Sequence, residues 1–245
     1  MAEDTDQKNP FTRPGFILAA VVVALVVVLG VVVGVVNATR SDPESQSSPS
    51  PSESSAAPTA DESAAAGGAS VCGLSGEVLS GSISTAPAAK WEYQGTVAYP
   101  TSSEAGPADT KNGVRTCFQH SPEGALFAAA NAVVQGSDES TVKAWLDYFV
   151  TGSARDQVLS AGAGSSTGSG TRVEIAGFRV LAYDGDSARI DVAVRGSASG
   201  KTLNLSMVYP LVWEDGDWKL NVTDASAPID VATIPDLAGY ITWGA

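Results

Sequence analysis

Few residues of this chain are of the types that perform acid–base or nucleophilic chemistry. Its 245 residues include one histidine, His120, and two cysteines, Cys72 and Cys117. The carboxylates Glu174 and Asp191 lie in segments where apolar and polar residues alternate, and each falls on the polar side. A catalytic carboxylate is normally tuned by burial. We therefore expect both carboxylates to face solvent.

The histidine and the tyrosines also have plain structural interpretations. His120 comes directly before a helix-start signal, so we expect a loop or capping residue. Tyr148 and Tyr209 are candidates for lining a cavity, but core packing with a hydrogen-bonded hydroxyl is the commoner use of tyrosine. One histidine and two distant cysteines give no metal-ligand spacing. We assign no catalytic, metal-binding or cofactor-binding residue, and we predict that the protein is not an enzyme.

The two cysteines are the one pair with a covalent option. Cys72 and Cys117 both fall in the C-terminal part of the chain, after residue 71, and an even count is typical of a disulfide. A bond between them closes a loop of about 45 residues and contributes roughly 2–4 kcal/mol of stability. Two unrelated buried thiols are the alternative.

The charge of the chain excludes one class of partner. It holds 27 acidic and 14 basic side chains, a net charge of −13, and has no lysine- or arginine-rich cluster. Nucleic-acid binding depends on neutralising phosphates with such clusters. We therefore predict no nucleic-acid partner.

The N-terminal region contains a long apolar segment. Residues 16–36 are uncharged and rich in valine, and as a helix they cover the roughly 30 Å core of a bilayer. Lys8 and Arg13 before the segment outnumber Arg40 after it, which predicts a cytoplasmic tail over 1–15. A cleaved signal peptide is the alternative, although its apolar core is usually shorter. The prediction is a single-pass protein of the cell membrane with an extracytoplasmic C-terminal domain.

The next segments lead to the folded part. Residues 37–71 are rich in serine, proline, alanine and acids, which predicts a disordered linker. Residues 72–120 read as an irregular lead-in with one or two short strands. Ser121, Pro122 and Glu123 then form a helix-start signal before an alanine-rich helix that runs to Gly136. Two more helices are predicted, near 138–149 and 155–161.

Beyond residue 170 the apolar period falls to two, which indicates strands. We expect strands over 171–183, 187–195 and 201–213, and a closing one over 218–222, with a β-bulge near Gly177. Pro210 should sit at an edge or bulge. Residues 121–224 are thus predicted to be an α+β cone, with about three helices packed on a bent antiparallel sheet of about four to six strands.

Two stretches carry a resemblance to a known fold. Residues 121–125 read Ser-Pro-Glu-Gly-Ala, and residues 213–220 form a hairpin that closes with Gly216, Trp218 and Lys219. Together with the bent hairpin sheet, they resemble the nuclear-transport-factor-two-like fold. The same fold hosts scaffolds, ligand binders and cavity enzymes, so the function must be argued from the site.

The remaining resemblance concerns the biological process. Gly106, Pro107 and Gly113, the stretch 120–125 and the terminal 237–243, taken with the N-terminal anchor, are similar to membrane proteins of conjugative elements in high-GC Gram-positive bacteria. More distantly, the layout resembles scaffold subunits of type IV secretion channels. This implies a non-enzymatic scaffold of a cell-envelope assembly, with envelope proteins, the bilayer and a second copy as partners. A small-ligand or lipid-uptake accessory domain is one alternative, and a cavity enzyme is another.

The C-terminal tail, residues 225–245, has two interpretations. Its apolar residues either pack back on the sheet of the same domain or form a surface for a partner. The residues that would form this surface are Ile234, Leu237, Tyr240, Ile241 and Trp243.

Overall fold

The computed structural model describes residues 70–162, 172–198 and 201–245. This part of the chain has three helices, namely α2 (Pro122–Gln135), α3 (Val142–Phe149) and α4 (Arg155–Ala161). The start signal of the first one is confirmed, because the Ser121 hydroxyl accepts a hydrogen bond from the Gly124 backbone N–H at 3.0 Å.

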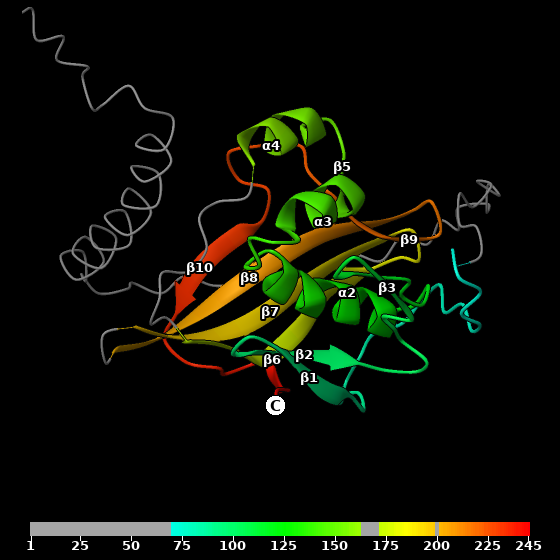
Figure 1. Ribbon diagram of the computed structural model, residues 1–245. Coiled ribbons are helices and arrows are strands. Elements are labelled where there is room, and N and C mark those ends of the chain that lie inside the picture. Colours follow the sequence, from blue (N-terminus) through cyan, green and yellow to red (C-terminus); the bar gives the residue numbers. More distant parts are fainter. Residues whose placement is uncertain (1–69, 163–171, 199–200) are drawn as a thin grey trace, which may run out of the picture. The chain divides into compact units, whose positions relative to one another are not determined.

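A seven-stranded sheet forms the second layer (Figure 1). Its long central strands are β6 (Arg172–Tyr183), β7 (Ser187–Ala198) and β8 (Lys201–Glu214). The shorter strands are β5 (Val150–Thr151), β9 (Asp217–Asn221), β10 (Asp230–Ile234) and β11 (Ile241–Thr242). The order is β11-β6-β7-β8-β9-β5, and β10 also pairs with β8.

This sheet corrects the predicted fold. The prediction was an antiparallel sheet of four to six strands, whereas the sheet has seven strands and is mixed, since β5 runs parallel to β9. Strands of two residues, such as β5 and β11, are too short to show a period of two. Their pairing is set by contacts between segments far apart in the chain.

Two irregularities of the long strands match the sequence pattern. The register between β6 and β7 shifts between Ile175 and Gly177, where the bulge was predicted. A Cβ at Gly177 would lie 2.8 Å from the Ile241 carbonyl oxygen, so only glycine lets β11 approach here. Pro210 sits where β8 changes partner, after the residues paired with β10 and before those paired with β9. Its missing N–H therefore removes no bond from either ladder.

The lead-in contains two separate hairpins. Strand β1 (Lys90–Gln94) pairs with β2 (Val97–Thr101), and β3 (Asp109–Lys111) pairs with β4 (Val114–Thr116). The core lies between these hairpins, the helices and one face of the sheet. Alanines 125, 128, 129 and 132 of α2 are buried and let this helix lie close to β6 and β7.

The membrane prediction is also corrected. No helix in the described ranges is long and apolar enough to cross a bilayer. The segment 16–36, on which the single-pass topology and the membrane location depended, lies outside the described residues, as do the predicted tail 1–15 and nearly all of the linker 37–71.

Candidate functional site

The core-facing side of the sheet continues past the helices as an apolar surface. Residues paired across neighbouring strands share a face, and three such rows cross this side. They are Phe178, Val192, Met207 and Val231 in the first, Ile175, Val194, Leu205 and Thr233 in the second, and Val173, Gly196 and Leu203 in the third. Phe178 and Val192 are fully buried, but Val231 is 47% and Leu203 53% exposed.

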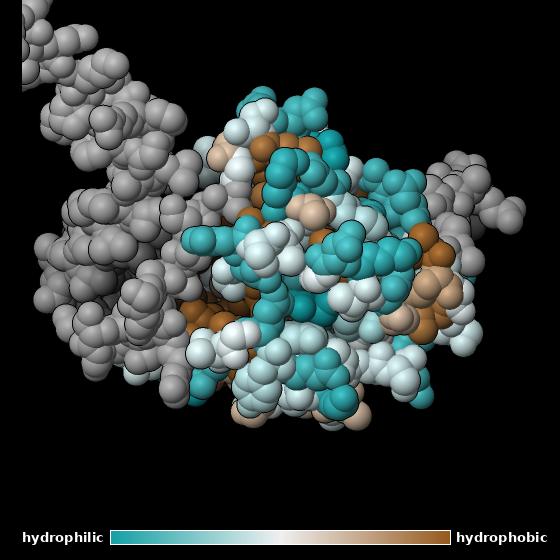
Figure 2. Space-filling model, in the orientation of Figure 1, coloured by the Kyte–Doolittle hydropathy of each residue, from teal (hydrophilic) through white to brown (hydrophobic). Residues whose placement is uncertain are grey.

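We call Val173, Leu203, Leu205, Met207 and Val231 the apolar end of the sheet. These five residues are half-buried or exposed, whereas the same face nearer to α2 belongs to the core. The strands run past α2 in Figure 1, and Figure 2 shows hydrophobic surface beside β8 and β10. Single exposed apolar residues are common, but a contiguous group on one face is a candidate contact site.

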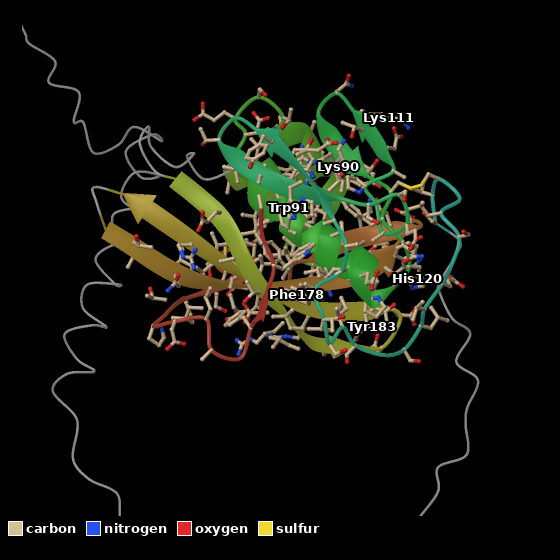
Figure 3. The ribbon with its side chains drawn as sticks, turned by 90° about the horizontal axis from the view of Figure 1, so that it is seen from below. Lys90, Trp91, Lys111, His120, Phe178 and Tyr183 are labelled. Carbon is tan, nitrogen blue, oxygen red and sulfur yellow. A yellow bond between two sulfur atoms is a disulfide. The ribbon has the colours of Figure 1, made fainter. Side chains whose placement is uncertain are left out.

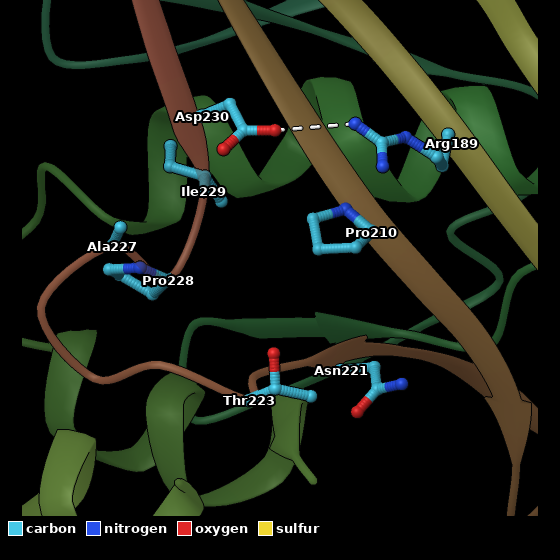
Figure 4. A pocket seen from close by; sticks show the side chains of 8 residues that line it. All are labelled: Arg189, Pro210, Asn221, Thr223, Ala227, Pro228, Ile229 and Asp230. Atoms are coloured by element: carbon cyan, nitrogen blue, oxygen red, sulfur yellow. Dashed lines mark hydrogen bonds and ion pairs between the residues drawn. The ribbon is translucent and has the colours of Figure 1, made fainter.

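Four charged residues of the same strands lie on the opposite face of the sheet and form two ion pairs. Arg195 Nη1 lies 2.6 Å from Glu174 Oε1, and Arg189 Nη2 lies 3.3 Å from Asp230 Oδ2. All four side chains are largely exposed, so Glu174 faces solvent as predicted. The second pair borders a shallow pocket of about 280 Å³ beside the start of β10 (Figure 4). Such exposed pairs contribute little to stability.

The opposite face of the sheet corrects the prediction for Asp191. It lies on the non-core face, as the alternation indicated, but it is fully buried instead of solvated. Its carboxylate accepts hydrogen bonds from the Tyr240 hydroxyl at 2.8 Å, from the Ser206 hydroxyl at 2.8 Å and from Arg179 Nε at 3.1 Å. These bonds satisfy the buried charge, which makes Asp191 a structural residue.

The residues that bury Asp191 belong to what we call the C-terminal strap, residues 235–243. The strap runs from β10, beside β8, to β11, beside β6, and so crosses the sheet on the Asp191 face. Leu237, Tyr240 and Ile241 are half-buried along it, as is Ile234 at the end of β10. Trp243 is buried in the core against Phe127, Phe178 and Trp91, so it cannot belong to an exposed partner surface.

Removing the Tyr240 hydroxyl should measurably weaken the strap. Tyr240→Phe keeps the ring over the Arg179 guanidinium, 4.1 Å away, but loses the bond to Asp191. We expect a loss of about 1 kcal/mol in the free energy of unfolding, measured with urea. Tyr93→Phe, at a tyrosine that is 67% exposed, is the matched control and should change nothing. Equal effects of the two substitutions would contradict this role of the strap.

His120 lies in the loop directly before the Ser121 cap, as predicted, but its side chain is buried. It is 1% exposed and stacks on Trp213 with ring centroids 4.0 Å apart (Figure 3). Its Nδ1 lies 2.9 Å from Glu77 Oε1, and its Nε2 lies 2.8 Å from the Gly185 carbonyl oxygen. Both ring nitrogens are engaged, so neither remains to take a proton from a substrate.

The two tyrosines considered for a cavity have different surroundings. Tyr209 lies in the core, where burial raises the pKa of its hydroxyl. Tyr148 lines a pocket of about 350 Å³ beside β3 and β4, and its hydroxyl donates to Asp217 Oδ2 at 2.6 Å. Burial and the Asp217 carboxylate raise the pKa of Tyr148, which keeps its proton at neutral pH.

The same pocket is bordered by the disulfide. The structure joins Cys72 to Cys117, with Cα atoms 6.0 Å apart (Figure 3). Cys117 is buried, and its backbone N–H donates to Asp217 Oδ2 at 2.7 Å. Lys219 is also buried, with its Nζ 3.2 Å from the centroid of the Tyr148 ring, and burial lowers its pKa. The polar groups around this pocket are thus held by bonds within the domain.

The described residues include no group of three or more His, Cys, Asp or Glu side chains placed to hold a metal ion. The apolar end was not among the site residues predicted from the sequence. Its signal was present in the alternation over 201–213, but period alone does not reveal which part of an apolar face the helices leave uncovered.

The comparisons with known proteins identify the family of the chain, but they find no protein whose function could be compared with it. A family model with the description "Domain of unknown function (DUF8175)" matches residues 47–242. No curated protein and no solved structure matches the chain.

Proposed function

The chain belongs to the family described as a domain of unknown function (DUF8175), and we propose that its described domain is a non-enzymatic binding module. In this proposal the apolar end docks against a partner protein, and the chain acts as a scaffold or accessory subunit of a multi-protein assembly. The observation that carries the proposal is the rise in exposure along three rows of one apolar face. The sequence resemblance points to a conjugative transfer apparatus as the assembly.

The surroundings of the buried polar groups support binding over catalysis. Asp191, Asp217 and His120 are each hydrogen-bonded on several sides by groups of the domain. A general acid or base must instead keep an atom free to reach a substrate. The apolar end offers no such group, because its five residues are aliphatic or thioether side chains.

The side chains of the apolar end indicate what kind of segment fits the site. The Glu174–Arg195 and Arg189–Asp230 pairs lie on the opposite face of the sheet, so none of these four charges faces a partner on the apolar end. The five side chains of the apolar end are uncharged, so they complement an uncharged apolar segment and offer no ion pair to a charged one. We therefore expect the partner to contribute aliphatic or aromatic side chains at the centre of the contact.

Photo-crosslinking in the native cell tests the proposal. A photoreactive phenylalanine analogue replaces Leu203 in the full chain, and the same analogue replaces Leu181 in the control. Leu181 is 46% exposed, similar to Leu203, but lies outside the three rows. We expect one discrete protein adduct from position 203 and none from 181. Val231→Asp on the position-203 background should abolish that adduct.

Three results would overturn the proposed function. These are the absence of any adduct from position 203, equal adducts from both positions, and an adduct that consists of lipid alone. Val231→Asp changes an exposed side chain and should cost less than about 0.5 kcal/mol of stability. Loss of the adduct can then be assigned to the contact and not to unfolding.

A further inference from the structure

Strand β10 leaves one edge of the sheet open. Among the described residues, β8 is the only strand that pairs with β10, so the other side of β10 has no strand partner. Its first four residues are exposed and the fifth, Ile234, is half-buried. An open edge presents unpaired N–H and C=O groups to a second chain. Proteins that avoid such pairing place charged residues, proline or a bulge on the edge. Of these, Asp230–Ile234 has only Asp230, which is paired with Arg189 of the same chain.

We propose that two copies of this chain associate through β10, strand against strand and antiparallel, about a two-fold axis at Ala232. This register places Val231 beside Thr233 of the partner subunit, and Asp230 beside Ile234 of the partner subunit. Pairing ends after Ile234, because Pro235 has no N–H to donate. The five-residue strand is thus complementary to itself.

Charge and apolarity both favour a second copy at this edge. The only charged side chain of β10, Asp230, is paired with Arg189 of the same chain, so the two copies do not bring unpaired like charges together. Val231 and Thr233 lie on the face of Met207 and Leu205, to which they are paired. The two-fold axis would therefore join the apolar ends of both copies into one continuous surface.

This contact goes beyond the partner binding proposed above and does not depend on it. It uses the backbone edge of β10, whereas partner binding uses the side chains of the apolar end. A dimer still exposes Leu203, which lies two rows from Val231, and presents the partner with two apolar ends. An interface of five residues a side is small, so we expect a weak dimer that depends on protein concentration.

Opposite charges at the axis give a specific test. Ala232 is exposed on the face away from the apolar end, so Ala232→Lys and Ala232→Glu should fold normally, which circular dichroism would verify. Each variant alone brings two like charges face to face, and we expect its dimer Kd to rise by about fivefold or more in sedimentation velocity of the full chain. A one-to-one mixture should form a heterodimer at least as tight as the original dimer.

Ala182→Lys is the matched control, since Ala182 is an exposed alanine on β6, and it should leave the Kd unchanged. The proposal is overturned if the unaltered chain stays monomeric at every concentration, or if Ala232→Lys dimerises as well as Ala182→Lys does. It is also overturned if the charge variants fail to recombine. In the first and second cases the crosslink at position 203 can persist, so the two proposals fail independently.

Discussion

Asp217→Ala should destabilise the domain by about 3–5 kcal/mol. The Asp217 carboxylate is fully buried and accepts bonds from the backbone N–H groups of Cys117 at 2.7 Å, Phe118 at 2.9 Å and Trp218 at 3.0 Å, and from the Tyr148 hydroxyl at 2.6 Å. Alanine leaves these buried donors without an acceptor, and each unsatisfied donor costs about 1–3 kcal/mol. The measurement is urea unfolding of the full chain, followed by tryptophan fluorescence.

Two variants separate the hydrogen bonds of Asp217 from its charge. Asp217→Asn keeps one side-chain oxygen as acceptor, so it should lose less stability than the alanine variant. Tyr148→Phe removes only one of the four bonds and should cost about 1 kcal/mol. If alanine and asparagine had equal effects, the carboxylate would not be acting through its two acceptor oxygens.

The second large effect concerns the disulfide. Replacing Cys72 and Cys117 by serine should lower the free energy of unfolding by about 2–4 kcal/mol, because the bond closes a loop with a sequence separation of 45 residues. The bond restricts the conformations of the unfolded chain. Removing the bond restores this conformational entropy and so stabilises the unfolded state. The two cysteines are the only ones in the chain, so no other thiol can take over the pairing.

Reduction provides an internal control for this prediction. Dithiothreitol should destabilise the unaltered chain by the same amount as the double substitution, and it should leave the double variant unchanged. The segment beside Cys72 is also held by a hydrogen bond from the Val71 N–H to the Gly216 carbonyl oxygen at 2.8 Å. We therefore expect the reduced domain to keep its native fold. An unaltered unfolding midpoint after complete reduction would contradict the prediction.

The features that were predicted correctly from the sequence are those that depend on neighbouring residues in the chain. The Ser121 cap, the bulge near Gly177 and the long alternating strands all follow from residues within one element. The alternation also assigned Asp191 to the correct face, but it could not show that the face is covered. That depends on the strap, whose Tyr240 reaches Asp191 across 49 positions of sequence.

The candidate site was missed for a related physical reason. An apolar face identifies the side of a strand that packs inward, but the boundary between its covered and open parts depends on the lengths of the helices above it. The helix α2 ends at Gln135, and the long strands β7 and β8 extend beyond it. The pairing of β10 with β8 is likewise non-local and has no signature in either strand alone.

The pairing of Trp213 with Trp218 gives the domain an optical signature. The two indoles lie on adjacent positions of β8 and β9, with ring centroids 5.4 Å apart and planes inclined by 71°. Indoles that are this close and inclined couple their electronic transitions, which produces an exciton couplet in circular dichroism. The couplet disappears when the hairpin opens, even if the helices persist. Dimerisation at β10 does not involve these rings, so we expect the couplet to be unchanged by it. The couplet therefore reports on folding alone during the association experiments.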